Sequence, residues 1–199
     1  METTISQEEF NKLMKIKGEV RGMAFKSGMD FVLKEKGNKG LKEVEKLLAE
    51  LGYFIEFGKI EPMNFYPLGL MSVSLLAAER LFGFTHEKFI EMGRFTAKSP
   101  LIIRLFLKYF GSLEMIARET QGMHQKYFTV GEVKVIEINK EEKLMVIRRE
   151  NFWLHPLHCY ISQGFYPAIL EMVIGSKVSC EVTKSPYRGD EYHEFVFRW

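Results

Sequence analysis

The sequence predicts an α+β fold, in which an N-terminal helical layer packs on a small antiparallel sheet made of two C-terminal hairpins separated by a helix. Apolar residues recur every three or four positions to about residue 126, and then alternate with polar residues near 130–150 and again near the C-terminus. With 199 residues, 46% of them hydrophobic, the chain can bury one core. We therefore expect a single domain over 1–199, helical over about 6–126 and hairpin-helix-hairpin over about 128–199.

Capping residues and glycines mark the first helices. Ser6, with Glu9 three residues later, forms the sequence pattern of a capping box at the start of a short helix. A longer amphipathic helix is predicted over 19–35, ending at Gly37. A stripe of leucines and a valine then predicts another helix over 41–51.

The next segment, FYPLGLMSVSLLAAERLFG, predicts a buried helix that ends at Gly83. Thr85 is expected to cap the following helix, THEKFIEMGRFTAK. Pro100 then begins LIIRLFLKYFG, and Ser112 is expected to cap the last helix of the helical part. Gly93 and Gly164 are expected to allow close approach of helices, because they carry no Cβ.

From Val130 the spacing of apolar residues changes to two. NKEEK separates two alternating runs, so residues 130–150 predict a β-hairpin. His155-Pro156 opens a further helix that closes at Gly175. Residues 177–184 and 192–199 then predict a second hairpin.

The last predicted strand has a distinct aromatic face. Alternation places His193, Phe195, Phe197 and Trp199 on one side, which we assign to the core. Gly189-Asp190 supplies the turn that precedes this strand. The terminal segment therefore belongs to the sheet.

This C-terminal segment resembles the 4-vinyl reductase domain family, whose signature runs cysteine, Gly-Asp, second cysteine, and then alternating apolar positions. Here Ser185, Gly189-Asp190 and His193 occupy those places. A resemblance to a second bacterial family of similar design covers nearly the whole chain, through the segments 17–22 and 65–68 and the terminal tryptophan. Such domains are related in fold to the haem nitric-oxide-binding domain and to the Golgi tethering subunits of TRAPP.

The resemblance implies an internal apolar pocket for small hydrophobic ligands and a sensory or accessory role. Two departures bear on cofactors. Ser185 and His193 stand where the family has cysteines, and serine is a poor zinc ligand. The Y-x-S-x-R motif for haem propionates is also missing, since Gly164 follows Tyr160-Ile161-Ser162 at the arginine position. We leave the cofactor unknown and do not expect haem.

The stretch NFWLHPLHCY, residues 151–160, holds the densest group of chemically active side chains. His155 and Cys159 are one helical turn apart, with Cys180 and His193 expected across the sheet. Zinc binding, lining of a pocket, and ordinary packing are the alternatives. Because paired CxxC motifs are missing and His155 is a loose fit as a base for Cys159, we predict no metal site and no catalytic residue.

The 17 phenylalanines and 11 methionines indicate either a filled core or an adaptable apolar cavity. The predicted ligand-binding residues are Phe65, Tyr66, Met71, Met92, Phe95, Phe106, Tyr109, Trp153, His155, His158 and Cys159.

A formal charge of +2, from 28 basic and 26 acidic residues without a basic stripe, argues against nucleic acid as a partner. The apolar segments are shorter than the roughly 20 residues that cross a bilayer, and no signal peptide is evident, so we expect a cytoplasmic protein. The leading interpretation is a non-catalytic ligand-binding or sensory domain, expected to form a homodimer. The alternatives are a TRAPP-like interaction module, or an enzyme or accessory protein of tetrapyrrole or aromatic metabolism.

Overall fold

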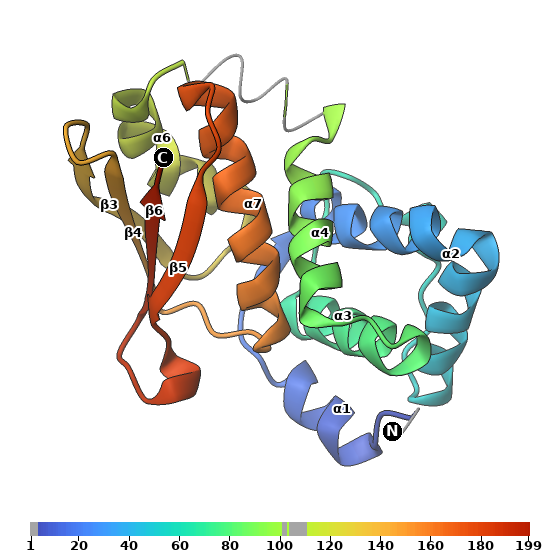
Figure 1. The fold of residues 1–199 in the computed structure, drawn as a ribbon. Helices are drawn as coiled ribbons and strands as arrows, with labels where there is room; N and C mark the ends of the chain where they lie inside the picture. The colour runs from blue at the N-terminus through green and yellow to red at the C-terminus, as the bar shows by residue number, and fades with distance from the viewer. Residues whose placement is uncertain (1–3, 101–102, 104–110) are drawn as a thin grey trace.

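The computed structural model describes residues 4–100, 103 and 111–199, and confirms the predicted α+β fold (Figure 1). The helices are α1 (Gln7–Met14), α2 (Gly22–Glu50), α3 (Leu68–Phe82), α4 (His86–Ala97), α6 (Leu113–Tyr127) and α7 (Leu157–Ile174). The strands are β1 (Glu19–Arg21), β2 (Phe65–Pro67), β3 (Glu132–Asn139), β4 (Leu144–Glu150), β5 (Ser179–Lys184) and β6 (His193–Arg198). Most of the predicted LIIRLFLKYFG segment lies outside the described residues. Within the described part of the chain, every helix is too short or too polar to span a membrane.

The predicted helix caps are formed. The hydroxyls of Ser6, Thr85 and Ser112 each accept the backbone N–H three residues later, at 3.1, 3.4 and 3.2 Å. These bonds satisfy N–H groups that have no partner within the helix. Gly83 and Gly175 adopt the left-handed conformation at the ends of α3 and α7, as the sequence predicts.

The helix predicted over 19–35 is wrong at its start, because Glu19–Arg21 is strand β1 and pairs antiparallel with β2. The helix begins at Gly22, whose N–H donates to the carbonyl oxygen of Asn64 at 2.7 Å. Local apolar spacing carries no signal of a partner more than forty residues away. Further along, Gly37 interrupts α2 with φ 68° and ψ −173°, at the predicted helix end.

The four-stranded sheet has the order β3-β4-β6-β5, and all its neighbours are antiparallel. Both predicted hairpins are therefore confirmed, and β6 of the second pairs with β4 of the first. On one face Met145 pairs with Phe197, and Ile147 pairs with Phe195. All four are buried together with Leu170 of α7, which covers this face (Figure 1).

Helix α7 lies between the sheet and α4 (Figure 1). Where α4 and α7 cross, a Cβ on Gly93 would overlap the carbonyl oxygen of Ile161, and a Cβ on Gly164 would overlap that of Ile90. The two backbones can touch only because both positions are glycine. This close crossing joins the helical part to the sheet part and fixes the cavity described next.

Candidate functional site: an apolar cavity with a buried arginine

A cavity of about 240 Å³ lies between the helices and the sheet. Helices α2, α3, α4, α6 and α7 and strands β3 and β4 contribute to its wall. The wall is mainly apolar and contains five methionines, Met23, Met29, Met71, Met92 and Met123. The volume exceeds the roughly 150 Å³ of a cavity that binds benzene but is below the roughly 300–1,000 Å³ of typical ligand pockets. Flexible methionines allow such a wall to adapt in shape.

Three of the predicted ligand-binding residues, Met71, Met92 and His158, line this cavity. Phe106 and Tyr109 lie outside the described residues. The remaining predicted residues are elsewhere in the molecule: Phe65, Tyr66, Phe95, Trp153, His155 and Cys159.

Those remaining side chains have other surroundings. Trp153 is 60% exposed, and the ring of Phe65 lies on the outside with the guanidinium of Arg21 at 4.7 Å. Phe95 packs against Phe31 in the helical core, with ring centroids 5.5 Å apart. The abundance of aromatic residues in the sequence does not determine which of their side chains face a cavity.

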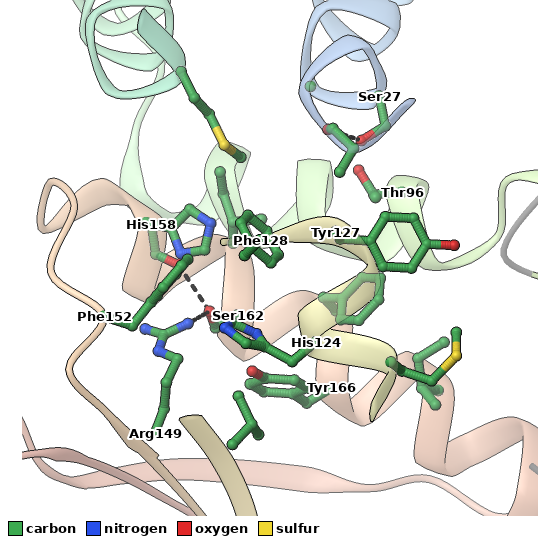
Figure 2. A pocket seen from close by; sticks show the side chains of 18 of the residues that line it. Ser27, Thr96, His124, Tyr127, Phe128, Arg149, Phe152, His158, Ser162 and Tyr166 are labelled. Carbon is green, nitrogen blue, oxygen red and sulfur yellow. Dashed lines mark hydrogen bonds between the residues drawn. The ribbon is translucent and has the colours of Figure 1, made fainter. Parts of the chain in front are cut away.

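Arg149 is the main cavity residue that the sequence interpretation missed. Alternation along β4 places it on the same face as the buried Met145 and Ile147, and its side chain is only 3% exposed. Its Nη1 donates to the hydroxyl of Ser162 at 2.9 Å, and that hydroxyl donates to the carbonyl oxygen of His158 at 3.0 Å (Figure 2). A charged residue in the inward register of a strand was the signal available in the sequence.

The positive charge of Arg149 has no acidic partner within the described part of the chain. Among the described residues, no Asp or Glu lines the cavity or pairs with Arg149, and Nε also lacks a hydrogen-bond partner. The rings of Phe152 and Phe195, with centroids 5.1 and 5.3 Å from the guanidinium carbon, offset part of the cost. An uncompensated buried charge still costs several kcal/mol. The described part of the cavity wall therefore carries a net positive charge.

Two histidines of the wall are neutral. Burial, followed by the charge of Arg149, holds the pKa of His158 well below its usual range. Its Nδ1 is buried and finds no partner in the described part of the chain. Burial also lowers the pKa of His124, whose Nε2 lies 2.8 Å from the carbonyl oxygen of Val130. Neutral imidazole nitrogens are the form that binds metals.

Tyr166 also lines the cavity, one helical turn after Ser162 on α7 (Figure 2). Burial raises the pKa of its phenol, although the charge of Arg149 acts in the opposite direction. The phenol is therefore neutral at physiological pH. A tyrosine, a serine and an arginine thus meet at one end of the cavity, although they come from α7 and β4.

The predicted Cys/His cluster is assembled only in part. The Sγ of Cys159 lies 3.6 Å from Nδ1 of His193, while Cys180 pairs across the sheet with Phe197. Burial raises the pKa of the Cys159 thiol, and burial with the charge of Arg149 lowers the pKa of His193 to about 3. A neutral thiol beside a neutral imidazole is a poor nucleophile. Within residues 4–100, 103 and 111–199, no three His, Cys, Asp or Glu side chains could hold a metal together.

No family model matches the chain, and no curated protein matches it either, so the resemblance to the 4-vinyl reductase and TRAPP families stays a prediction. Solved structures do share the fold. An H-NOX protein from S. oneidensis in the Fe(II)NO ligation state has a TM-score of 0.62 at 10% identity, covering 89% of this chain and 98% of its own.

Two further structures agree. The Fe(II) unliganded H-NOX protein from K. algicida gives a TM-score of 0.62 at 15% identity, covering 89% of this chain and 95% of its own. A structure described as probing the function of haem distortion in the H-NOX family has a TM-score of 0.65 at 12% identity, covering 90% of this chain and 94% of its own. The fold is therefore that of the haem nitric-oxide-binding domain.

This comparison overturns the expectation that haem is not the cofactor. That expectation depended on the missing linear Y-x-S-x-R motif. Solved structures of the same fold are, however, described as structures of haem proteins. The physical reason is that a linear motif requires three side chains on one segment. Here Tyr166, Ser162 and Arg149 reach the same cavity from two segments.

Proposed function

We propose that this protein is a non-catalytic sensory domain that binds a small, largely apolar ligand in the cavity between its helices and its sheet. The observation that carries the proposal is the cavity itself, because a wall rich in methionine surrounds a buried cation that has no acidic partner among the described residues. An empty cavity of this size would otherwise lower the stability of the protein. The H-NOX fold supports the proposal, since solved proteins of that fold are described in an Fe(II)NO ligation state and by their haem.

Haem is the first ligand to test. Two neutral imidazoles of the wall are candidates to bind the iron: His158, whose buried Nδ1 has no partner among the described residues, and His124. The Nε2 of His124 meets the carbonyl oxygen of Val130, and metal-binding histidines usually make such a bond through the ring nitrogen that does not bind the metal. Bound haem would supply an iron with a position for a diatomic gas. Because the cavity is smaller than typical ligand pockets, the methionines of the wall would have to move.

Native mass spectrometry of the purified protein, with parallel absorbance titration by hemin, tests the proposal. We expect either a co-purified small molecule that is lost on denaturation, or a new Soret band with one equivalent of hemin. Absence of both, for a folded protein, would contradict the proposal. A native dimer that binds nothing would instead favour the TRAPP-like interaction module.

A cavity-filling variant locates the binding site. A Cβ on Gly28 would lie 3.8 Å from the Sδ of Met92 and 4.0 Å from Leu75, which are ordinary contacts at the cavity wall. We expect Gly28→Leu to lower ligand uptake at least tenfold, because the new side chain occupies the space. Gly122→Leu on α6, where nothing lies within 4 Å, is the matched control and should bind as the wild type does.

A homodimer and a cytoplasmic location belong to this proposal as predictions. Size-exclusion chromatography with light scattering, at two protein concentrations, would measure the oligomeric state directly.

A further inference from the structure

We propose that the ligand of this cavity carries a carboxylate on an apolar body, and that Arg149, which is positioned by its hydrogen bond to Ser162, binds this carboxylate. The inference rests on the proposed function and names the chemical class of its ligand. It also assigns Arg149 as a ligand-binding residue, in addition to its position in the sheet.

The first argument is charge. Arg149 is 3% exposed and lines the cavity, yet no carboxylate pairs with it among the described residues. Transferring a charge into the interior without a partner is unfavourable, so buried cations in proteins are normally paired. An anionic group on a ligand would supply the partner that the described residues do not supply.

The neighbouring arginine on the same strand provides an internal comparison. Arg148 points to the other face, where its guanidinium lies 3.5 Å from the carboxylate of Glu194 and 4.0 Å from that of Glu150. It also stacks on the ring of Tyr192, at 3.9 Å. The half-buried face of β4 thus provides acidic partners for Arg148, whereas the described residues of the buried face provide none for Arg149.

The second argument is geometry and chemistry. A guanidinium has five N–H donors in a planar fork that matches a carboxylate. In Arg149 one donor group, Nη1, bonds to Ser162, while Nε is without a partner in the described part of the chain. The hydroxyl of Ser162 is already bonded to Arg149 and to the carbonyl oxygen of His158, and the phenol of Tyr166 is neutral, so neither side chain places a negative charge beside the guanidinium. The rest of the wall is mainly apolar, which suits the body of such a ligand.

An apolar acid can come from two sources, the propionate edge of haem or a small organic acid. The cavity volume of about 240 Å³ lies nearer to a medium-chain or aryl acid than to a large macrocycle. The shared chemistry is the carboxylate, and the experiment separates the two sources.

Isothermal titration calorimetry at pH 7.5 compares octanoate with 1-octanol, which has the same chain without the charge. We expect the wild type to bind octanoate at least tenfold more tightly than 1-octanol, because a hydrogen bond to a charged group is worth about 1.5–3 kcal/mol. Arg149→Met keeps the length of the side chain and removes its charge. It should bind octanoate at least tenfold more weakly and 1-octanol within about twofold of the wild type.

Arg148→Met is the matched control and should bind both compounds as the wild type does. Equal binding of octanoate and 1-octanol by the wild type, or an unchanged octanoate affinity in Arg149→Met, would overturn the inference while leaving the proposed function intact. No binding of octanoate, 1-octanol or hemin by a folded wild type would overturn both. Far-ultraviolet circular dichroism confirms that each variant is folded, and Arg149→Gln replaces Arg149→Met if the latter is not.

The hemin arm identifies the source. If haem is the natural ligand, hemin should displace octanoate at one equivalent and bind Arg149→Met at least tenfold more weakly, as judged by the Soret titration. If a small acid is the ligand, octanoate should bind while hemin produces no saturable Soret change. An Arg149→Met variant that binds both hemin and octanoate as the wild type does contradicts the inference for either source.

Discussion

At the scale of single residues, the register of Arg149 carries much of the functional argument. The alternating pattern of LMVIRREN predicts which side chains of β4 face inward, and Arg149 falls in that set with Ile147. An arginine in an inward position is a local conflict between polarity and burial, and such conflicts occur at functional sites. The sequence thus contained the register, but only the packing of α7 and Phe152 around the side chain shows that it is buried.

The buried histidines predict a specific acid sensitivity. Burial and the charge of Arg149 lower the pKa of His193 to about 3, and burial with the charge of Arg80 lowers that of His155 to about 4. An unfolded histidine titrates near 6.5. Between about pH 6.5 and these folded-state pKa values, the unfolded chain binds more protons than the folded chain. The contribution of these histidines to the free energy of unfolding is therefore complete above pH 6.5 and is lost as the pH falls.

Urea denaturation at pH 7.0 and pH 4.5 measures this effect for the wild type and His193→Gln. His193, which is 1% exposed, should account for about 2 kcal/mol of the loss in the free energy of unfolding over this range. The variant should therefore lose less stability than the wild type on acidification, whatever its stability at neutral pH. Equal losses in the two proteins would contradict this assignment.

At the scale of secondary-structure elements, the crossing of α4 and α7 determines where the cavity lies. Gly93 and Gly164 were expected to permit close approach, and the carbonyl oxygens of Ile161 and Ile90 occupy the space that their side chains would need. Helix propensity alone disfavours glycine inside a helix. Their presence here is explained by the contact between backbones, which places α7 against both the sheet and the helical layer.

Alanine substitutions test that explanation. Gly164→Ala should lower the free energy of unfolding by about 2 kcal/mol or more, because the added Cβ forces the two helices apart. Gly122→Ala, in the middle of α6 with nothing within 4 Å, should raise stability by up to about 1 kcal/mol through helix propensity. Chemical denaturation of both variants gives the comparison, and similar effects at the two sites would contradict the account.

At the scale of the whole molecule, two buried clusters flank the cavity. One is formed by the helices with Phe152, Leu154 and part of α7, and the other by the sheet with α6 and the C-terminal half of α7. The cavity wall draws on both clusters, so a ligand inside would contact both. Binding should therefore stabilise the whole protein rather than one element.

Thermal denaturation at increasing concentrations of octanoate checks this expectation. At a ligand concentration of one hundred times Kd, the native state should gain about 2.7 kcal/mol, seen as a rise of several degrees in Tm. Hydrogen exchange should slow in both α2 and β4. Protection confined to one of the two, with an unchanged Tm, would indicate a surface site instead of the cavity.

The sequence by itself determined the fold class, the two hairpins, the caps at Ser6, Thr85 and Ser112, and the inward face of β6. These features follow from spacing and local hydrogen bonding, which act over a few residues. Only the tertiary structure decided that Glu19–Arg21 is a strand, and that Arg149, Ser162, Tyr166 and His158 meet in one cavity. Those outcomes depend on contacts between segments far apart in the chain, so a search for linear motifs could not reveal them.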